Sequence, residues 1–177
     1  MSMKKTVVII NGTGSCGKDT VDEIVSKYCK TYRIDSVEIP KYILGLSYVG
    51  WDGVKTPEAR IALSKLKRVL SEFNDCVFIN MTARVEVFMS ASFDYMYAFV
   101  HIREKPEIDR LHDYCVERGY NVKKCLVLGH HERNWGNDSD DNPEYFNPDD
   151  YDIVLYNDSD KSSLEEQVKR AFNLGKF

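Results

Sequence analysis

The feature that most constrains the fold is a glycine-rich segment near the start of the chain, GTGSCGKDT at positions 12–20. It follows a β-branched run at 6–11 (TVVIIN), which predicts a buried, central and parallel strand. It precedes a helical pattern at 18–30, in which apolar residues share one face. A chain that passes from a strand through glycines into a helix directs its backbone N–H groups and the helix dipole at one hollow. The segment therefore predicts a P-loop, which binds a polyphosphate.

The side chains of this loop predict a nucleoside triphosphate with magnesium as the ligand. Lys18 brings a positive charge to the β- and γ-phosphates, and a hydroxyl beside the lysine normally holds Mg²⁺. In this chain Asp19 follows the lysine, and Thr20 comes one place later. Either Thr20 holds the metal, directly or through water, or Asp19 approaches the metal or the acceptor as a carboxylate. The expected nucleotide-binding residues are Gly12, Thr13, Gly14, Ser15, Cys16, Gly17, Lys18, Asp19 and Thr20.

The bulk composition restricts the classes of partner. The chain has 177 residues, which suits a single domain over 1–177. It carries 24 basic and 28 acidic side chains, a formal net charge of −4. Proteins that bind nucleic-acid polymers or membrane surfaces usually have a basic excess, so we expect neither partner. A local basic pocket for phosphates is compatible with this charge.

The five cysteines indicate a reducing compartment. Their number is odd and no two are spaced as C-x-x-C, which argues against a disulfide framework and a zinc site. The N-terminal apolar run ends at Ile10, too early for the apolar part of a signal peptide, and no apolar stretch is long enough to span a bilayer. We expect a cytoplasmic protein, and the sequence leaves open whether it is a monomer or a homodimer.

Strand patterns alternate with helix patterns along the chain. The expected strands are 6–11, 36–39, 76–80, 95–102, 125–128 and 151–157. The expected helices are 18–30, 56–73, 83–92, 105–118 and 162–172, and 42–55 is expected to be a loop. This alternation is typical of a parallel α/β sheet with helices on both faces. The irregular, acidic segment 129–150 is expected to be a lid-like functional loop.

Two arginines are placed to reach phosphates. A parallel sheet binds its ligand at the carboxyl ends of the strands, and Arg84 and Arg103 each follow an expected strand. Phosphoryl transfer depends on positioning and charge stabilisation, so arginines near the P-loop are natural partners for the transferred group. A surface salt bridge is the alternative role for each of them.

Several segments resemble one group of kinases. The sequence Gly17-Lys18-Asp19-Thr20 resembles the GK-D-T loop of phage-type deoxynucleoside monophosphate kinases. It is also similar to the GK-G-T loop of adenylate kinases, where the hydroxyl is displaced by one residue in the same way. The segment 50–60 resembles the W-D-G segment that follows the second strand in such kinases. The segments 101–108 and 151–157 resemble their fourth strand, with the arginine after it, and their final strand.

The resemblance implies a fold, a reaction and roles for individual residues. The fold would be adenylate-kinase-like, with a five-stranded parallel sheet in a three-layer P-loop NTPase domain. The reaction would transfer the γ-phosphoryl group of ATP, with Mg²⁺, to a nucleoside monophosphate or nucleoside. Arg133 would close over the transferred phosphate from the lid. The expected catalytic residues are Lys18, Asp19, Arg103 and Arg133, and the expected acceptor-binding residues are Trp51, Asp52, Lys55 and Arg84.

Two departures from the family pattern keep other functions open. The expected strand 76–80 ends at Asn80, where an aspartate that organises the metal is often found. The expected lid is acidic and carries one arginine, Arg133. One alternative is a P-loop protein that binds nucleotide without catalysis, and another is a kinase of a non-nucleotide phosphorylated metabolite.

Overall fold

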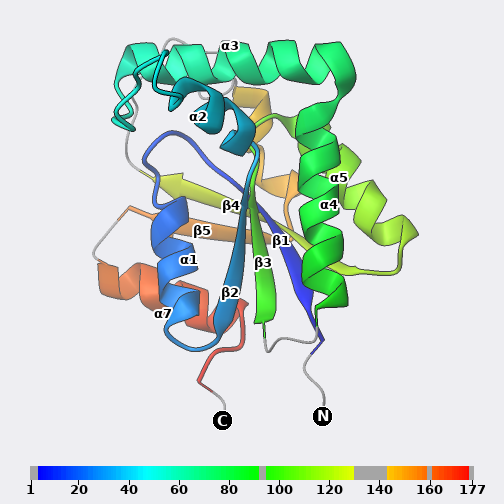
Figure 1. The fold of residues 1–177 in the computed structure, drawn as a ribbon. Helices are drawn as coiled ribbons and strands as arrows, with labels where there is room; N and C mark the ends of the chain where they lie inside the picture. Colours follow the sequence, from blue (N-terminus) through cyan, green and yellow to red (C-terminus); the bar gives the residue numbers. More distant parts are fainter. Residues whose placement is uncertain (1–3, 92–94, 130–142, 159–160, 176–177) are drawn as a thin grey trace.

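The computed structural model describes residues 4–91, 95–129, 143–158 and 161–175, which form a three-layer α/β structure (Figure 1). In this part of the chain the central sheet has five strands in the order β2-β3-β1-β4-β5, and every pairing is parallel. This order places β1, the strand before the glycine-rich loop, at the centre of the sheet. The expected fold class, a parallel α/β sheet with helices on both faces, is confirmed.

The elements have the following bounds. The strands are β1 (Thr6–Asn11), β2 (Lys30–Asp35), β3 (Tyr95–His101), β4 (Asn121–Gly129) and β5 (Ile153–Asn157). The helices are α1 (Lys18–Ser26), α2 (Glu38–Leu44), α3 (Pro57–Asn74), α4 (Cys76–Ser90), α5 (Lys105–Glu117) and α7 (Lys161–Ala171). The short 3-10 helices η1 (Pro143–Phe146) and η2 (Pro148–Asp150) precede β5.

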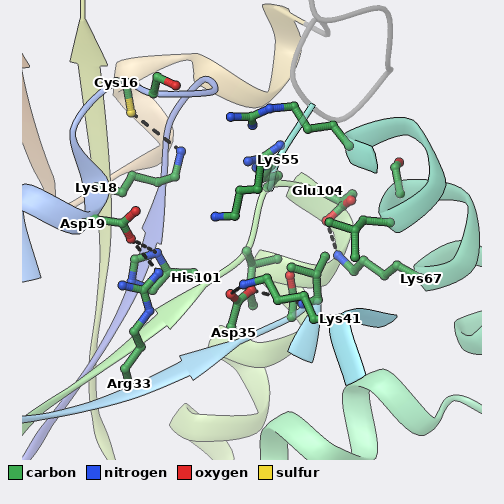
Figure 2. Close-up of a pocket in the computed structure, with 18 of the residues that line it drawn as sticks. Cys16, Lys18, Asp19, Arg33, Asp35, Lys41, Lys55, Lys67, His101 and Glu104 are labelled. Atoms are coloured by element: carbon green, nitrogen blue, oxygen red, sulfur yellow. Dashed lines mark hydrogen bonds and ion pairs between the residues drawn. The ribbon is translucent and has the colours of Figure 1, made fainter. Parts of the chain in front are cut away.

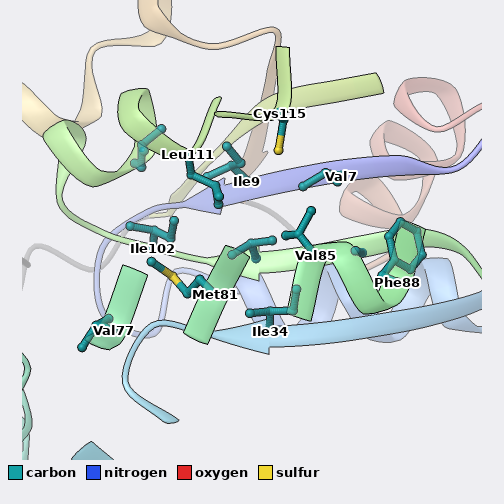
Figure 3. Packing of buried hydrophobic residues seen from close by; sticks show 13 residues of the cluster. Val7, Ile9, Ile34, Val77, Met81, Val85, Phe88, Ile102, Leu111 and Cys115 are labelled. Atoms are coloured by element: carbon teal, nitrogen blue, oxygen red, sulfur yellow. The ribbon is translucent and has the colours of Figure 1, made fainter. Parts of the chain in front are cut away.

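The central strand β1 supplies both faces of the core. All its residues are buried, and successive side chains of a strand point to opposite faces. Val7 and Ile9 pack into a cluster with residues of α4 and α5, including Phe88 (Figure 3). Val8 and Ile10 pack on the other face into a cluster with residues of α1 and α7. This two-sided burial explains why the strand is a continuous apolar run rather than an alternating one.

Two expected strands are wrong. The segment 76–80 is the first part of helix α4, so Asn80 does not end a strand. The second strand of the sheet is Lys30–Asp35, and the segment 36–39 leads into helix α2 instead. The strand expected at 95–102 is therefore β3, the third strand in chain order and the direct neighbour of β1.

Helix α3 begins where the sequence predicts. The Thr56 hydroxyl accepts a hydrogen bond from the backbone N–H of Ala59 at 3.2 Å, and Pro57 occupies the first turn. The helix crosses one end of the molecule above α2, near the loop that follows β1 (Figure 1). Its inner face is thereby placed opposite the carboxyl ends of the central strands. No helix in the described part of the chain combines the length and the apolar character needed to cross a membrane.

Candidate functional site

The loop after β1 has the backbone shape that the glycine pattern predicts. Gly12 has φ 146° and Gly17 has φ 106°, both in the region that favours glycine. A Cβ atom on Gly12 would lie 2.4 Å from the carbonyl oxygen of Val127, and one on Gly17 would lie 2.5 Å from Nδ2 of Asn157. The Asn157 amide also donates to the carbonyl of Cys16 at 2.9 Å. The ends of β4 and β5 therefore hold the loop in place, and both glycines are sterically required.

Lys18 is turned into the concave side of this loop. Its Nζ donates to the carbonyl oxygens of Gly12 and Thr13 at 2.5 and 2.7 Å, and it lies 3.7 Å from Sγ of Cys16. An ammonium group in this position is close to where a polyphosphate is bound by a P-loop. The geometry is that of a loop prepared for an anion.

The loop opens into a cavity of about 310 Å³ at the carboxyl ends of β1, β2 and β3 (Figure 2). Seven lysines and arginines line it, against three acidic side chains, although the whole chain has a net charge of −4. The described lining residues are Ser15, Cys16, Gly17, Lys18, Asp19, Thr20, Arg33, Asp35, Ser36, Val37, Lys41, Lys55, Arg60, Leu63, Ser64, Lys67, His101, Ile102, Arg103 and Glu104. The local charge is therefore opposite to the net charge of the molecule and suits anionic ligands.

One cluster of charges lies beside the P-loop. Arg33 forms an ion pair with Asp19 at 2.5 Å, and Nδ1 of His101 lies 4.0 Å from the same carboxylate oxygen (Figure 2). Burial raises the pKa of Asp19, but the charge and the hydrogen bond of Arg33, with smaller contributions from neighbouring groups, together lower it more, so the net pKa lies below its ordinary value. Asp19 is therefore ionised at neutral pH.

His101 ends β3 and is 8% exposed. Burial, and then the positive charge of Arg33, lower the pKa of His101 to about 3, so the imidazole is neutral at physiological pH. Its Nε2 is buried and has no hydrogen-bond partner among the described residues. A buried polar atom without a partner, in a residue that lines a cavity, suggests a contact that a ligand completes.

A second group of polar and charged side chains comes from β2, α3 and the chain between them. We call Asp35, Lys41, Lys55, Arg60 and Ser64 the polar wall; all five line the cavity. Lys41 forms an ion pair with Asp35. Burial raises the pKa of Asp35, but the charge of Lys41 and hydrogen bonds from Lys41 and the Val37 backbone together lower it by more. The net pKa of Asp35 lies below its ordinary value, so this carboxylate is also ionised.

Lys67 joins α3 to the start of α5. Its side chain is 4% exposed, and its ammonium group pairs with Glu104 and, at 2.6 Å, with Glu107. Burial raises the pKa of Glu107, and Lys67 opposes this rise. The bridge fixes the wall of the cavity next to Arg103.

The structure brings together only part of the site expected from the sequence. Six of the loop residues, 15–20, line the cavity with Lys55 and Arg103, whereas Gly12, Thr13 and Gly14 form the loop behind it. Trp51 and Asp52 do not line the cavity; the Trp51 indole donates to the carbonyl of Val54, and Asp52 accepts from the Val54 N–H. Arg133 and most of the expected lid lie outside the described residues.

Arg84 occupies a different environment from the one expected. It lies on helix α4, because the strand that was expected just before it does not exist. Its guanidinium pairs with Glu38, and it also donates to the Tyr32 hydroxyl and to the carbonyl of Arg33 at 3.3 Å each. Of the two roles expected for Arg84, a phosphate contact or a salt bridge, the observed contacts are those of a salt bridge.

The cavity also contains residues that the sequence did not single out: Arg33, Asp35, Lys41, Arg60, Lys67 and His101. A correct placement of β2 would have indicated Asp35, because Asp35 stands at the carboxyl end of a strand. The basic residues on α2 and α3 carry no local motif, so only the packing of these helices over the sheet brings them to the site.

The donor set near the loop is compatible with Mg²⁺ that arrives with a nucleotide. Thr20 and the ionised Asp19 line the same cavity as Lys18. Within the described ranges there is no group of three or more His, Cys, Asp or Glu residues that could hold a metal on its own. Mg²⁺ commonly takes one or two protein ligands and completes its shell with phosphate oxygens and water. This part of the chain thus shows no metal centre built from protein ligands alone, and its residues fit a Mg²⁺ ion that is shared with the phosphates of a nucleotide.

Asn11 ties the loop to a distant part of the chain. It is fully buried; its Oδ1 accepts from the Gly12 N–H at 2.7 Å, and its Nδ2 donates to the Tyr145 carbonyl at 2.9 Å and the Tyr151 hydroxyl at 2.7 Å. The start of the loop is thereby fixed by the residues that precede β5.

Comparisons with known proteins identify the fold. No family model matches the sequence, and no curated protein matches it. Among solved structures, the Deinococcus radiodurans tunicamycin resistance protein matches with a TM-score of 0.58 at 13% identity, over 96% of this chain and 97% of that one. Dephospho-CoA kinase from Campylobacter jejuni matches with a TM-score of 0.56 at 11% identity, over 94% of this chain and 95% of that one.

A third similar structure is the Mycobacterium tuberculosis APS kinase in complex with AMPPNP and APS. It matches with a TM-score of 0.56 at 9% identity, over 96% of this chain and 98% of that one. At such low identities the likeness concerns the fold, and it extends over almost the whole of each chain. The chain therefore has the three-layer α/β fold found in P-loop kinases.

Proposed function

We propose that the protein is an ATP-dependent phosphotransferase that transfers the γ-phosphoryl group to a small acceptor. The observation that carries this proposal is that the P-loop, with Lys18, and the polar wall line the same cavity. Phosphoryl transfer requires the γ-phosphoryl group and the acceptor oxygen to lie in line within a few ångströms, with the charge on the phosphates neutralised. One basic cavity lined by both groups of residues suits this requirement.

The nucleotide would bind at the P-loop. The backbone amides of residues 12–17 would surround the β- and γ-phosphates, and Lys18 would exchange its two carbonyl contacts for phosphate oxygens. Thr20 and Asp19 would hold Mg²⁺, which when bound neutralises phosphate charge and orients the β- and γ-oxygens. Ion pairing with Arg33 supports this role for Asp19, because it keeps the carboxylate ionised.

Arginines would neutralise the charge on the transferred group. Arg103 lines the cavity immediately after β3 and fits this role. Arg133 stays a prediction from the family resemblance, since it lies outside the described residues. Lys55 would contact the acceptor, for which the resemblance suggests a nucleoside monophosphate or a nucleoside.

The first prediction tests transfer itself. Release of ADP, measured in a coupled assay with ATP, Mg²⁺ and a panel of acceptors, should rise well above the rate with ATP alone for at least one acceptor. Lys18→Ala should lower the acceptor-dependent kcat by about 10²-fold or more, since it removes charge stabilisation from the transferring phosphate. If every acceptor leaves the rate at the level of ATP alone, transfer is not the function.

A nucleotide-binding protein without catalysis is the alternative that the same experiment addresses. It would bind ATP in a calorimeter and show no acceptor-dependent release of ADP. One argument for this alternative was the position of Asn80 at the end of a strand, and that argument no longer applies because Asn80 lies on helix α4.

A further inference from the structure

Strand β5 is an edge strand without a charged side chain. Among the described residues it pairs only with β4, so its other side presents backbone N–H and C=O groups that no strand pairs. Its sequence, IVLYN, is mostly β-branched, apolar and aromatic. An edge strand of this composition is a template on which a second chain can add a strand. The opposite edge strand, β2, reads KTYRID, and its charged side chains by themselves discourage such pairing.

One side-chain amide covers part of this open edge of β5. Oε1 of Gln167 accepts a hydrogen bond from the Tyr156 N–H at 2.9 Å, and Nε2 of Gln167 donates to the Tyr156 carbonyl at 2.8 Å. The amide thus contacts both backbone groups of one residue, as a residue of an antiparallel neighbouring strand would. Tyr156 is 48% exposed, so water could satisfy the same two groups if the amide were absent. What the amide excludes from this position is therefore another backbone.

The packing of helix α7 fixes the position of Gln167. Leu164 and Val168, on the same helix, are buried in a core cluster that includes Leu155 of β5. At 3.6 residues per turn, Gln167 lies directly beside this buried stripe, on the flank of the helix. Its Nε2 also lies 3.5 Å from the carbonyl oxygen of Ser163, one turn earlier. The amide is thus held over the edge by a helix that is anchored in the core.

We propose that Gln167 masks the β5 edge and so prevents a second copy of the chain from extending the sheet. Without the amide, β5 would pair with the same edge of another copy, because a two-fold axis brings two identical edge strands together antiparallel. The sheets of the two copies would then form one continuous sheet. This masking requires no nucleotide and is independent of the proposed phosphotransferase activity.

Sedimentation equilibrium between about 10 and 300 µM tests the masking, because this range covers weak contacts between small surfaces. Over this range the average mass of Gln167→Ala should rise up to about twofold relative to that of the natural chain. Gln167→Met has nearly the length and helix propensity of glutamine without its amide, so it should associate in the same way. The matched control is Glu166→Ala, since Glu166 is exposed on the same helix and pairs with Arg170 at 3.6 Å. This control should associate no more than the natural chain.

Hydrogen exchange of the Tyr156 amide, followed by mass spectrometry, locates the contact. At about 10 µM this amide should exchange about tenfold faster in the Gln167 variants than in the natural chain, because its hydrogen bond to the side chain is lost. At about 300 µM it should regain protection, since a second β5 then covers it. If both variants keep the mass of the natural chain at every concentration, or if they associate while Tyr156 stays unprotected, Gln167 does not mask this edge.

Discussion

The pKa of His101 shows the combined effect of burial and neighbouring charges in the site. It ends β3, beside the P-loop strand, where its imidazole is enclosed by Arg33, Asp19 and Asp35. Two carboxylates would favour a charged imidazole, yet burial and the nearby cations keep it neutral. The folded protein therefore resists a proton that the unfolded chain accepts.

This difference predicts a loss of stability in mild acid. An unfolded histidine titrates near its ordinary pKa of 6.5, whereas in the folded state the pKa is about 3. Between these values only the unfolded chain binds the proton, so the free energy of unfolding falls as the pH falls. From pH 7 to pH 5 the contribution of His101 should amount to about 2 kcal/mol.

Urea unfolding at pH 7, 6 and 5 in metal-free buffer measures this effect against His101→Asn, which cannot titrate. The variant should lose about 2 kcal/mol less than the natural chain over the same range. Parallel pH profiles for the two proteins would show that His101 is not the group responsible.

Site residues that are adjacent in the sequence could be predicted, whereas residues that come together only in the folded structure could not. Lys18, Asp19 and Thr20 form one motif, and their places in the cavity follow from the loop alone. Lys41 and Arg60 come from separate helices, and nothing in their local sequence distinguishes them from the solvent-exposed lysines and arginines of an ordinary helix. Only the folded structure shows which residues make up the polar wall.

The secondary structure elements were predictable where the pattern was long and closed by a cap or a glycine. Helix α3 has a threonine cap and a proline in its first turn, and β1 is an unbroken β-branched run. The short apolar run 76–80 fits a buried strand and a buried helix equally well, and here it begins α4. Strand β2 is partly exposed at the edge of the sheet and carries polar residues, so its pattern was too weak to place it.

The contact between α3 and the start of α5 gives a prediction at the scale of elements. Lys67→Met removes an almost fully buried ammonium group and leaves Glu104 and Glu107 without their shared partner. Because both carboxylates keep some exposure to solvent, the loss should be about 2 kcal/mol, below that of a fully buried pair. Denaturation in urea measures it.

The matched control for this prediction is Lys65→Met, an exposed change of the same chemistry on the same helix. It should alter stability by no more than about 0.5 kcal/mol. Equal effects of the two substitutions would mean that the bridge does not hold α3 to the core.

At the scale of the whole molecule, Asn11 couples the P-loop to a segment more than 130 positions later in the chain. Asn11→Ala removes one hydrogen bond each from the Gly12 N–H, the Tyr145 carbonyl and the Tyr151 hydroxyl, although the Tyr151 hydroxyl still donates to the Tyr145 carbonyl at 2.7 Å. We expect a loss of about 3 kcal/mol in the free energy of unfolding and weaker binding of AMPPNP. Tyr151→Phe removes only one of these groups and should cost about 1 kcal/mol. A larger effect of Tyr151→Phe than of Asn11→Ala would contradict this coupling.

The contrast between a basic cavity and an acidic chain has a consequence for which anions can be bound. A short anion can place all its charge inside the hollow, where lysines and arginines outnumber carboxylates. A long polyanion would have to lay most of its length along an exterior that carries the excess negative charge of the molecule. The protein should therefore bind anions of the size of a metabolite in the cavity and repel long polymers that carry the same charged groups.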